Sequence, residues 1–581
     1  MKKKFFYIAM VALALTGCSD SLSTIGSSDG NSEITIPADA EAGELLIKFS
    51  PEMSDILDQA QLSKTRAGKA TRSGIPSTDE VLDILGSYSF ERVFPVDANT
   101  EARTREAGLH LWYTVKFNKG TDLKAAAERL KQLGEISKVQ TNGRIKRAYN
   151  TDSKRIYLSD KALQQKSTRS AAEGEPNDPG FASQWHYRNL GEDHYDFEKL
   201  NNNQVGAKAG CDVNALEAWK TCTGDPSIIV AILDEGVMYT HPDLAANMWC
   251  NPGETTQGAK TDGDGNGYDG DLHGYNFVTE SGDITWTDAN DTGHGTHVAG
   301  TIAAVNNNGK GVCGVAGGDG TPNSGVKIMS CQVFSGQNSV TLAGEARAIK
   351  YAADNGAVIL QCSWGYNSSE SSIINGYTPG PATEKEWAET YPLEKEALDY
   401  FINNAGSPNG VIDGGIPVFA AGNEYAGNPA FPGAYSKCVS VSSLAADFTP
   451  ACYTDFGSLV TLSAPGGDLD YYSKIGEQED EYWAETTEQK GAVLSTMIKN
   501  GQPAYGYMEG TSMACPHVSG VAALGLAYAA KTNRHYRAAD FVALMKKSVK
   551  ELDSHYQNGA TKTYYMNHST VGASPEIVQL S

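Results

Sequence analysis

Continuous apolar runs that alternate with helical stretches are the feature that most restricts the fold of this chain. Four such runs follow Asn177, at residues 227–234, 325–334, 356–365 and 416–423. Each run is apolar almost throughout, which indicates strands that are buried on both faces. Strands of this kind, separated by helices, build a parallel sheet with helices on its two sides. We therefore predict an α/β fold with a mostly parallel sheet over residues 176–581.

The part of the chain before this region has a different pattern. Residues 44–150 mix strand-like stretches with helix-like stretches at 78–88 and 121–134, which is typical of a small α+β unit of the ferredoxin-like kind. Residues 151–175 are rich in Ser, Lys, Gln and Ala, so we expect an exposed linker there. Residues 19–43 are predicted to be a tether.

The first eighteen residues are predicted to be an export signal that is removed from the mature protein. Three lysines precede an apolar run from Phe5 to Leu15, which is too short to span a bilayer. The run ends in Leu15-Thr16-Gly17-Cys18, which resembles a bacterial lipoprotein signal box. We expect the Cys18 thiol to carry a lipid that anchors the protein to the cell envelope, at the outer membrane or surface. An ordinary signal peptide with a chance cysteine is the alternative.

Charge and cysteine usage exclude some classes of function. Residues 176–581 hold 22 Lys and Arg against 47 Asp and Glu. Such an acidic domain is not suited to bind nucleic acid, whereas it leaves room for bound cations. No cysteine spacing predicts a zinc site. Two pairs could form disulfides in an oxidising compartment, Cys211 with Cys222 and Cys438 with Cys452.

Residues with catalytic chemistry follow the predicted strands, where active sites of such sheets form. Asp234 and Asn423 end two of the runs, His294 and His297 open a helical stretch, and Ser512 precedes a long apolar helix. A serine hydroxyl becomes a nucleophile when a base takes its proton, a carboxylate orients that base, and donors stabilise the oxyanion. Taken singly, such residues are more often a helix cap, a core histidine or a turn.

Taken together, these stretches resemble the subtilisin-like serine proteases. The matching stretches are AILDEGV and HPDL within 231–244, GHGTHVAGTIAA at 293–304, AAGNE at 420–424 and GTSMACPHVSG at 510–520. The resemblance implies a serine endopeptidase in which Asp234 orients His294, His294 is the general base and acid, and Ser512 forms the acyl-enzyme. It also implies an oxyanion hole made by the Asn423 amide and the backbone N–H of Ser512. His297 is then expected to pack or to hydrogen-bond within its helix.

The same resemblance implies that polypeptide substrates bind as an added strand. The implied substrate-binding residues are Ser335, Gly336, Gln337, Ser363, Trp364 and Gly365. Trp364 could instead be a core aromatic. Two departures from the family pattern stand out. Glu235 occupies a position that is usually Ser or Thr, so we expect its side chain to point outward or to meet a cation. Residues 378–401 lengthen the spacing before Asn423, and we expect a solvated surface insertion with a helix.

Two acidic regions predict structural calcium, while no cofactor is expected for catalysis. Residues 261–271, TDGDGNGYDGD, partly match a calcium loop of the EF-hand type. Its candidate ligands are Asp262, Asp264, Asn266, Asp269 and Asp271. The family resemblance implies a second site at Asp243 and Asn307. A plain Asp- and Gly-rich surface loop is the alternative for both.

Residues 44–150 are similar to the prodomains of these proteases, which assist folding and then inhibit the enzyme. Residues 101–150 hold 11 basic and 5 acidic residues, which complements the acidic domain that follows. We therefore expect an autoprocessed, monomeric proenzyme whose prodomain is an intramolecular inhibitor. If Cys18 carries the lipid, cleavage within 151–175 would release residues 176–581 from the membrane.

Two other classes of function fit the sequence less well. An exported pseudoprotease that acts as a binding module would lack a triad or oxyanion residue, and none is missing. A metallopeptidase needs a glutamate beside the first histidine, in the spacing HExxH, and HGTH at 294–297 lacks it.

Overall fold

The structure is a computed structural model in which residues 36–581 form one compact unit. It describes residues 36–37, 40–67, 72–87, 89–147, 155–167, 174–192, 194–196, 204–371, 378–407, 409–469, 483–486, 491–552, 561–566 and 574–579. The predicted signal peptide with Cys18, and most of the predicted tether, lie outside the described residues.

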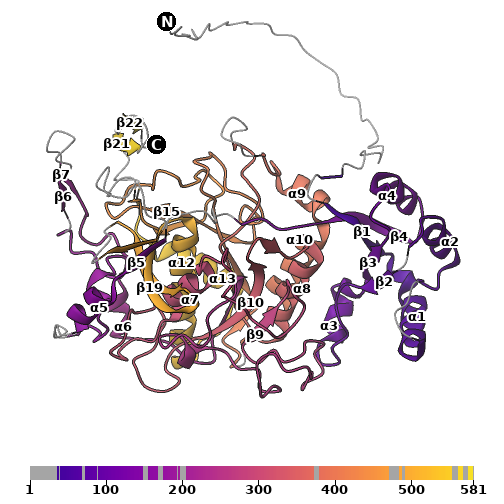
Figure 1. Ribbon diagram of the computed structural model, residues 1–581, viewed down its shortest axis with the longest axis horizontal. Coiled ribbons are helices and arrows are strands. Elements are labelled where there is room, and N and C mark those ends of the chain that lie inside the picture. Colours follow the sequence, from indigo (N-terminus) through magenta and orange to yellow (C-terminus); the bar gives the residue numbers. More distant parts are fainter. Residues whose placement is uncertain are drawn as a thin grey trace, which may run out of the picture. The chain divides into compact units, whose positions relative to one another are not determined.

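An eight-stranded sheet forms the centre of residues 176–581 (Figure 1). The strands are β8 (Ile229–Glu235), β9 (Gly274–Asn276), β10 (Lys327–Ser335), β11 (Asn338–Ser339), β12 (Ile359–Cys362), β14 (Ile416–Ala420), β15 (Val439–Leu444) and β16 (Leu462–Pro465). Their order is β11-β10-β8-β12-β14-β15-β16, with β9 also paired to β10. All pairs are parallel except β10 with β11. The predicted α/β class with a mostly parallel sheet is confirmed.

Helices cover both faces of this sheet. The four main ones are α7 (His294–Ala303), α8 (Leu342–Asp354), α10 (Pro392–Asn404) and α12 (Thr511–Lys531). Val230 and Ile232 of β8 belong to the core that includes α7 and α12, whereas Ala231 and Leu233 belong to the core that includes α8 and α10. Because successive side chains of a strand point to opposite faces, a continuous apolar run serves both cores. This alternation explains why β8 has no polar residue before Asp234.

The segment 378–401 is not the solvated insertion that its charge suggests. It contains α9 (Glu384–Thr390) and most of α10, and Trp387, Leu393, Leu398 and Phe401 are fully buried in the core shared with α8. The helical spacing of these apolar residues provides a buried face, and Glu394 is buried with them as an acceptor for the Trp387 indole N–H. The prediction of a surface excursion is therefore wrong for these residues.

The N-terminal unit is a four-stranded antiparallel sheet in the order β2-β3-β1-β4, with helices packed on it. Its elements are β1 (Ala40–Phe49), α1 (Ser54–Ala67), α2 (Pro76–Ile84), β2 (Ser89–Arg92), α3 (Glu101–Glu106), β3 (Trp112–Lys116), α4 (Leu123–Lys131) and β4 (Ile136–Gly143). The described residues thus agree with an α+β unit, although its first strand begins at Ala40, inside the predicted tether.

The segment after this unit differs from an exposed linker. It forms β5 (Arg155–Leu158) and α5 (Asp160–Ser167). Strand β5 pairs with β17 (Trp483–Thr486) and with β19 (Gln502–Met508), which itself pairs with β18 (Val493–Lys499). Ile156, Tyr157 and Leu158 are buried, and the Tyr157 hydroxyl donates to the Ile498 carbonyl at 2.9 Å. These apolar side chains outweigh the polar composition of their surroundings.

The remaining elements are short or peripheral. They are β6 (His194–Asp196), β7 (Gln204–Gly206), α6 (Ala215–Trp219), β13 (Ile412–Asp413), β20 (Tyr536–Arg537), α13 (Ala538–Lys547), β21 (Thr561–Met566) and β22 (Ser574–Gln579).

Candidate active site

Asp234 and His294 meet at the carboxyl end of β8. Asp234 is the penultimate residue of that strand, and His294 is the first residue of α7. His294 Nδ1 lies 2.9 Å from both carboxylate oxygens of Asp234, and the two side chains are only 3% and 1% exposed. Gly295 permits this approach, because a Cβ there would lie 2.1 Å from the Glu235 carbonyl oxygen. The carboxylate thus hydrogen-bonds one ring nitrogen, and this fixes the orientation of the imidazole.

Glu235 occupies the start of the same helix. Its carboxylate accepts hydrogen bonds from the backbone N–H groups of Thr292, Gly293 and His294 at 2.9–3.1 Å. These are N–H groups that a helix cannot satisfy internally, and a negative charge there also suits the helix dipole. The side chain is therefore buried, and the expectation that it points outward is wrong. The alternative expectation agrees with the structure, since Arg147 Nη2 lies 3.6 Å from Glu235 Oε1.

His297 holds α7 against the neighbouring strands. Its Nε2 lies 3.0 Å from the Val493 carbonyl oxygen and 3.2 Å from that of Gly506, so this nitrogen carries the proton. These partners lie on β18 and β19, and the expectation of bonding within the helix is wrong. Burial lowers the pKa of His297 to about 3, which keeps the ring neutral. The two histidines of the motif thus have different partners.

Ser512 lies at the N-terminal end of α12, next to the end of β12. The Ser363 hydroxyl donates to the Ser512 carbonyl at 3.0 Å, and the Ser512 hydroxyl lies 3.4 Å from the Ser363 carbonyl oxygen. Strand β12 pairs in parallel with β8, with Cys362 opposite Leu233. Ser363 therefore follows β12 at the level where Asp234 stands on β8. This register brings Asp234, His294 and Ser512 to the same edge of the sheet.

Gln361 secures α12 in this position, and the sequence reasoning missed it. Its Nε2 donates to Ser363 Oγ at 2.8 Å, and its Oε1 accepts from Cys515 Sγ at 3.4 Å and from Ser519 Oγ at 2.5 Å. The side chain is fully buried. A buried polar residue that makes all these bonds is strongly restricted in position. The available signal was a single amide side chain inside the otherwise apolar run of β12.

Asn423 lies just beyond β14 and is bonded to the start of α12. Its Oδ1 accepts from the backbone N–H and from the hydroxyl of Thr511, both at 2.9 Å. A Cβ built on Gly510 would lie 3.8 Å from both Asn423 Oδ1 and Ser512 Cβ, which shows how closely these residues gather. Because Thr511 engages Oδ1, the amide presents its donor group Nδ2 in the other direction.

Of the two predicted substrate-binding segments, residues 363–365 lie beside residues 144–147 of the N-terminal unit, whereas on the other side residues 144–147 pair with Val340 and Thr341, beyond the predicted residues 335–337. Ser335 ends β10, Gly336 turns the chain with φ 53°, and Gln337 is exposed. On the other segment Trp364 is 1% exposed and packs edge-on against Phe419, so its indole is a core aromatic. Its backbone nevertheless pairs antiparallel with Arg147, and the N–H of Ile145 donates to the Val340 carbonyl at 3.2 Å. Gly365 follows, and a Cβ there would lie 3.1 Å from the Phe431 carbonyl oxygen.

The acidic loop 261–271 brings together only some of its predicted ligands. Carboxylate oxygens of Asp264 and Asp271 converge with one from Glu254, all within 4.8 Å of one another. Asn266 belongs to the same group, because its Nδ2 donates to Asp264 at 3.2 Å and to Asp271 at 3.1 Å. Asp262 instead accepts backbone N–H groups of its own turn, and Asp269 is exposed. Glu254 lies outside the loop motif, so spacing alone does not reveal it.

The second predicted cation site is built differently from the expectation. Asp243 is fully buried and accepts from Asn308 Nδ2 at 2.6 Å and from the Val312 N–H at 2.9 Å. Asn307 turns its Oδ1 to the backbone N–H of Asn177 at 3.2 Å. Burial raises the pKa of Asp243 to about 8, and the neighbouring Asp178 charge adds to this effect. Oxygen ligands and closely spaced carboxylates are a donor set that fits calcium.

Cysteines 211, 222, 250, 313, 331, 362, 438, 452 and 515 are all unbridged thiols. Neither of the two disulfides that the sequence allows is formed in the described part of the chain.

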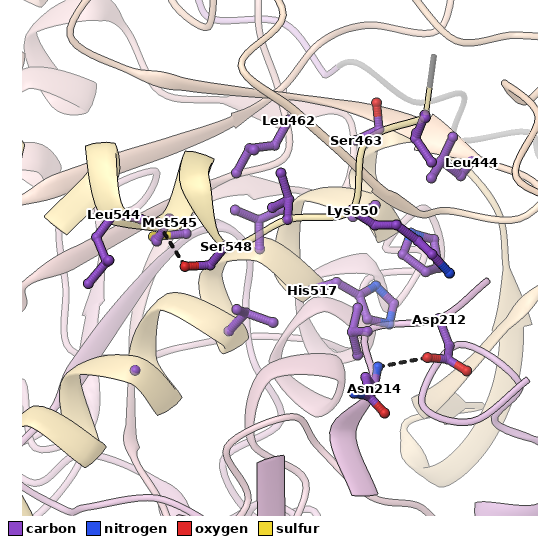
Figure 2. A pocket seen from close by; sticks show the side chains of 18 of the residues that line it. Asp212, Asn214, Leu444, Leu462, Ser463, His517, Leu544, Met545, Ser548 and Lys550 are labelled. Carbon is purple, nitrogen blue, oxygen red and sulfur yellow. Dashed lines mark hydrogen bonds between the residues drawn. The ribbon is translucent and has the colours of Figure 1, made fainter. Parts of the chain in front are cut away.

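A separate pocket of about 910 Å³ lies between α12 and α13. Figure 2 shows His517 at its wall, with Leu462, Leu544 and Met545 among the apolar side chains. His517 Nε2 lies 2.8 Å from His186 Nδ1, and burial lowers the pKa of His517 to about 4. His186 and His517 are therefore a neutral structural pair, and His517 belongs to the same helix as Ser512.

Comparison with known proteins shows the family to which the chain belongs. Residues 225–564 match the profile of the subtilase family. The chain belongs to this family. It is 30% identical to thermitase from Thermoactinomyces vulgaris over 329 residues, which cover 56% of this chain and 84% of thermitase. It is also 30% identical to halolysin from Haloferax mediterranei over 315 residues, 54% of this chain but only 44% of halolysin, so this subtilase spans less than half of that relative. The crystal structure of fervidolysin from Fervidobacterium pennivorans aligns with 85% of this chain and 55% of its own, at 19% identity and a TM-score of 0.46.

Proposed function

We propose that this subtilase is an exported serine endopeptidase that hydrolyses polypeptides through an acyl-enzyme. The observation that carries the proposal is the 2.9 Å contact between His294 Nδ1 and Asp234, at the sheet edge where Ser512 lies in the first turn of α12. A hydroxyl nucleophile, an oriented imidazole and a buried carboxylate are the parts that acyl transfer to serine requires.

In the proposed mechanism His294 removes the proton of Ser512 Oγ as this oxygen attacks the scissile carbonyl. Asp234 keeps the Nδ1–H tautomer in place, so Nε2 is the nitrogen that accepts the proton. The resulting imidazolium is stabilised by the adjacent carboxylate and then protonates the leaving amine. Water repeats the sequence on the acyl-enzyme, with His294 again acting first as base and then as acid.

The oxyanion that forms at each step needs preorganised donors. We assign these donors to Asn423 Nδ2 and to the backbone N–H of Ser512. The Ser512 N–H lies in the first turn of α12, where backbone donors have no partner within the helix. The two bonds from Thr511 to Asn423 Oδ1 support the assignment, because they turn the donor end of the amide away from Thr511.

The N-terminal unit is proposed to inhibit the enzyme until it is removed. Residues 144–147 pair antiparallel with Thr341 at Arg144 and with Trp364 at Arg147, as a bound peptide strand would. The rest of the unit is held through α10, where Glu396 accepts from Lys48 Nζ at 2.8 Å, Lys138 Nζ at 3.0 Å and Trp112 Nε1 at 2.7 Å. Charge-assisted bonds of this kind favour a specific and oriented association.

We place the processing site within residues 148–154, which lie outside the described residues. The N-terminal unit pairs with Trp364 at Arg147, whereas β5 is already part of another sheet from Arg155 onward. A cut between them would separate the prodomain and leave β5 with the mature enzyme. If Cys18 is lipidated, this cut also releases the enzyme from the cell envelope. The N-terminal residue of the mature protein, read by mass spectrometry, tests the site, and a mature N-terminus beyond Arg155 would contradict it.

Calcium is proposed to bind at Glu254, Asp264 and Asp271, and at Asp243. When bound, it would supply positive charge that offsets the repulsion between these carboxylates, without a part in the chemistry. Asn251 and Asn266 donate to Asp264 and Asp271 and keep the carboxylates in place.

Labelling with a serine-directed fluorophosphonate tests the proposed activity. The processed enzyme should be labelled and should hydrolyse fluorescent casein, whereas Ser512→Ala and His294→Ala should do neither. Ser548→Ala is a matched control, because Ser548 is exposed, directly follows α13 and donates its hydroxyl to the Leu544 carbonyl. Labelling of the Ser512→Ala variant, or casein hydrolysis by it, would contradict the assignment and favour a binding module.

A further inference from the structure

Residues 144–147, which end the described part of the N-terminal unit, are called the prodomain tail. Its basic residue Arg147 lies against a buried carboxylate beside the candidate active site. Arg147 Nη2 is 3.6 Å from Glu235 Oε1, and the Arg147 guanidinium carbon is 4.8 Å from the centre of the Phe334 ring. The two charged side chains are 10% and 2% exposed. With so little water present, the attraction between these charges and the interaction with the ring are stronger than at the surface.

Arg147 is held in this place by backbone pairing of the kind proposed for a substrate. It pairs antiparallel with Trp364, while Ile145 donates its N–H to Val340 on the other side. Alternate residues of an extended chain point to the same side, so the side chains of Ile145 and Arg147 occupy adjoining positions along the segments that pair with this strand. Ile145 is 2% exposed and packs in the apolar core with Phe334 and Val340. The prodomain tail therefore presents an apolar residue and, two residues later, a basic one.

The carboxylate that faces Arg147 cannot easily turn away. The N–H groups of Thr292, Gly293 and His294 hold Glu235 in place, whether or not a cation is present. Asp291 lies behind it and accepts from the Gly336 N–H at 2.6 Å. Burial, and then the charge of Glu235, raise the pKa of Asp291 to about 7, which shows that the negative potential extends across this corner. A neutral side chain at this position would leave a buried carboxylate without a countercharge, which is costly.

We propose that Glu235 and Phe334 form a subsite that selects arginine or lysine in the substrate, two residues after an apolar side chain. This inference rests on the proposed endopeptidase function and names its substrate class. Glu235 is then a specificity-determining residue, because its charge contributes to binding only when the substrate carries the matching charge.

The test compares internally quenched peptides that carry residues 143–152, GRIKRAYNTD, with either arginine or citrulline at position 147. Citrulline keeps the shape of arginine and lacks its charge. Mature wild-type enzyme should cleave the arginine peptide with a kcat/KM about tenfold or more above that of the citrulline peptide. In Glu235→Gln this ratio should fall close to one. Glutamine retains one acceptor oxygen for the N–H groups at the start of α7.

A matched control peptide carries norleucine in place of Lys146, which is exposed. The wild-type enzyme should cleave this peptide with nearly the same kcat/KM as the arginine peptide. If Glu235 only supports α7, Glu235→Gln will slow both peptides equally and leave their ratio unchanged, which overturns the subsite. Fluorophosphonate labelling separates the two proposals. Labelled wild-type enzyme that fails to prefer the arginine peptide contradicts the subsite, whereas wild-type enzyme that is not labelled contradicts the endopeptidase function itself.

Discussion

Replacing Asn423 by two different residues separates the two roles that its amide can have. Oδ1 accepts two bonds of 2.9 Å from Thr511, and Nδ2 is the proposed oxyanion donor. Asn423→Ala removes both functions. Asn423→Asp keeps an acceptor oxygen for Thr511 and removes only the donor, with almost no change in shape.

The two variants should differ in stability and agree in lost activity. Each hydrogen bond contributes about 0.5–1.5 kcal/mol to folding, so Asn423→Ala should lower the free energy of unfolding by about 1–3 kcal/mol. Asn423→Asp should change it little. Loss of one oxyanion donor costs about 10²- to 10³-fold in kcat. Both variants should therefore lose at least this much, and the aspartate more, because its negative charge opposes the oxyanion.

The assay is casein hydrolysis at saturating substrate, together with thermal denaturation followed by circular dichroism. Because impaired variants process themselves slowly, each is matured by a trace of affinity-tagged wild-type enzyme that is then removed. An Asn423→Asp variant with kcat within about tenfold of the wild type would refute the oxyanion assignment. The side chain would then act only as an anchor for the start of α12.

Three further predictions concern pH, inhibition and calcium. Burial and the charge of Glu424 raise the pKa of Asp455 to about 9, so the folded protein retains a proton that the unfolded chain releases above its ordinary value of 3.8. Stability should therefore fall as pH rises towards 9, and Asp455→Asn should flatten this slope in melting temperatures measured from about pH 5 to 9; equal slopes would contradict the reasoning. Glu396→Gln should shorten the lag before activity of the proenzyme appears, most clearly at low salt. The reason is that Glu396 loses the charge that attracts Lys48 and Lys138 of the N-terminal unit. An unchanged lag would count against a role of Glu396 in holding this unit. A chelator should lower the melting temperature of the wild type more than that of Asp271→Asn, because a ligand that binds only the folded state stabilises it; identical midpoints with and without chelator would exclude a bound metal.

The features that the sequence predicts well are those that depend on neighbouring residues. The apolar run of β8 and its final Asp234 indicate both the parallel sheet and a polar group at its carboxyl edge, and the fold class is confirmed. The motif around His294 identifies the helix that faces this group. Short-range patterns of this kind carry the information because strand burial and helix starts are decided within a few residues.

The features that sequence reasoning missed depend on partners far along the chain. Nothing near Glu235 indicates that its carboxylate turns to the start of α7, about 60 positions later, because only the packing of α7 on β8 brings them together. Glu254 joins the acidic loop 261–271 in the same way. Strand β5 is too short for a periodic signal, and its burial depends on β19. The buried face of α10 is different, because Leu393, Ala397 and Phe401 repeat at helical spacing and indicate it within the helix itself.

The pairing of β5 with β19 also decides when the chain can complete its structure. Residues 155–158 cannot complete their pairing until residues 483–486 and 502–508 have emerged, and the face of β8 with Val230 and Ile232 is not fully covered until α12 has followed. The strands of the N-terminal unit, by contrast, all lie between Ala40 and Gly143. Contacts between distant parts of a chain form slowly and leave apolar strands exposed meanwhile. The N-terminal sheet can thus fold first, whereas the larger sheet stays incomplete until the C-terminal elements have been synthesised.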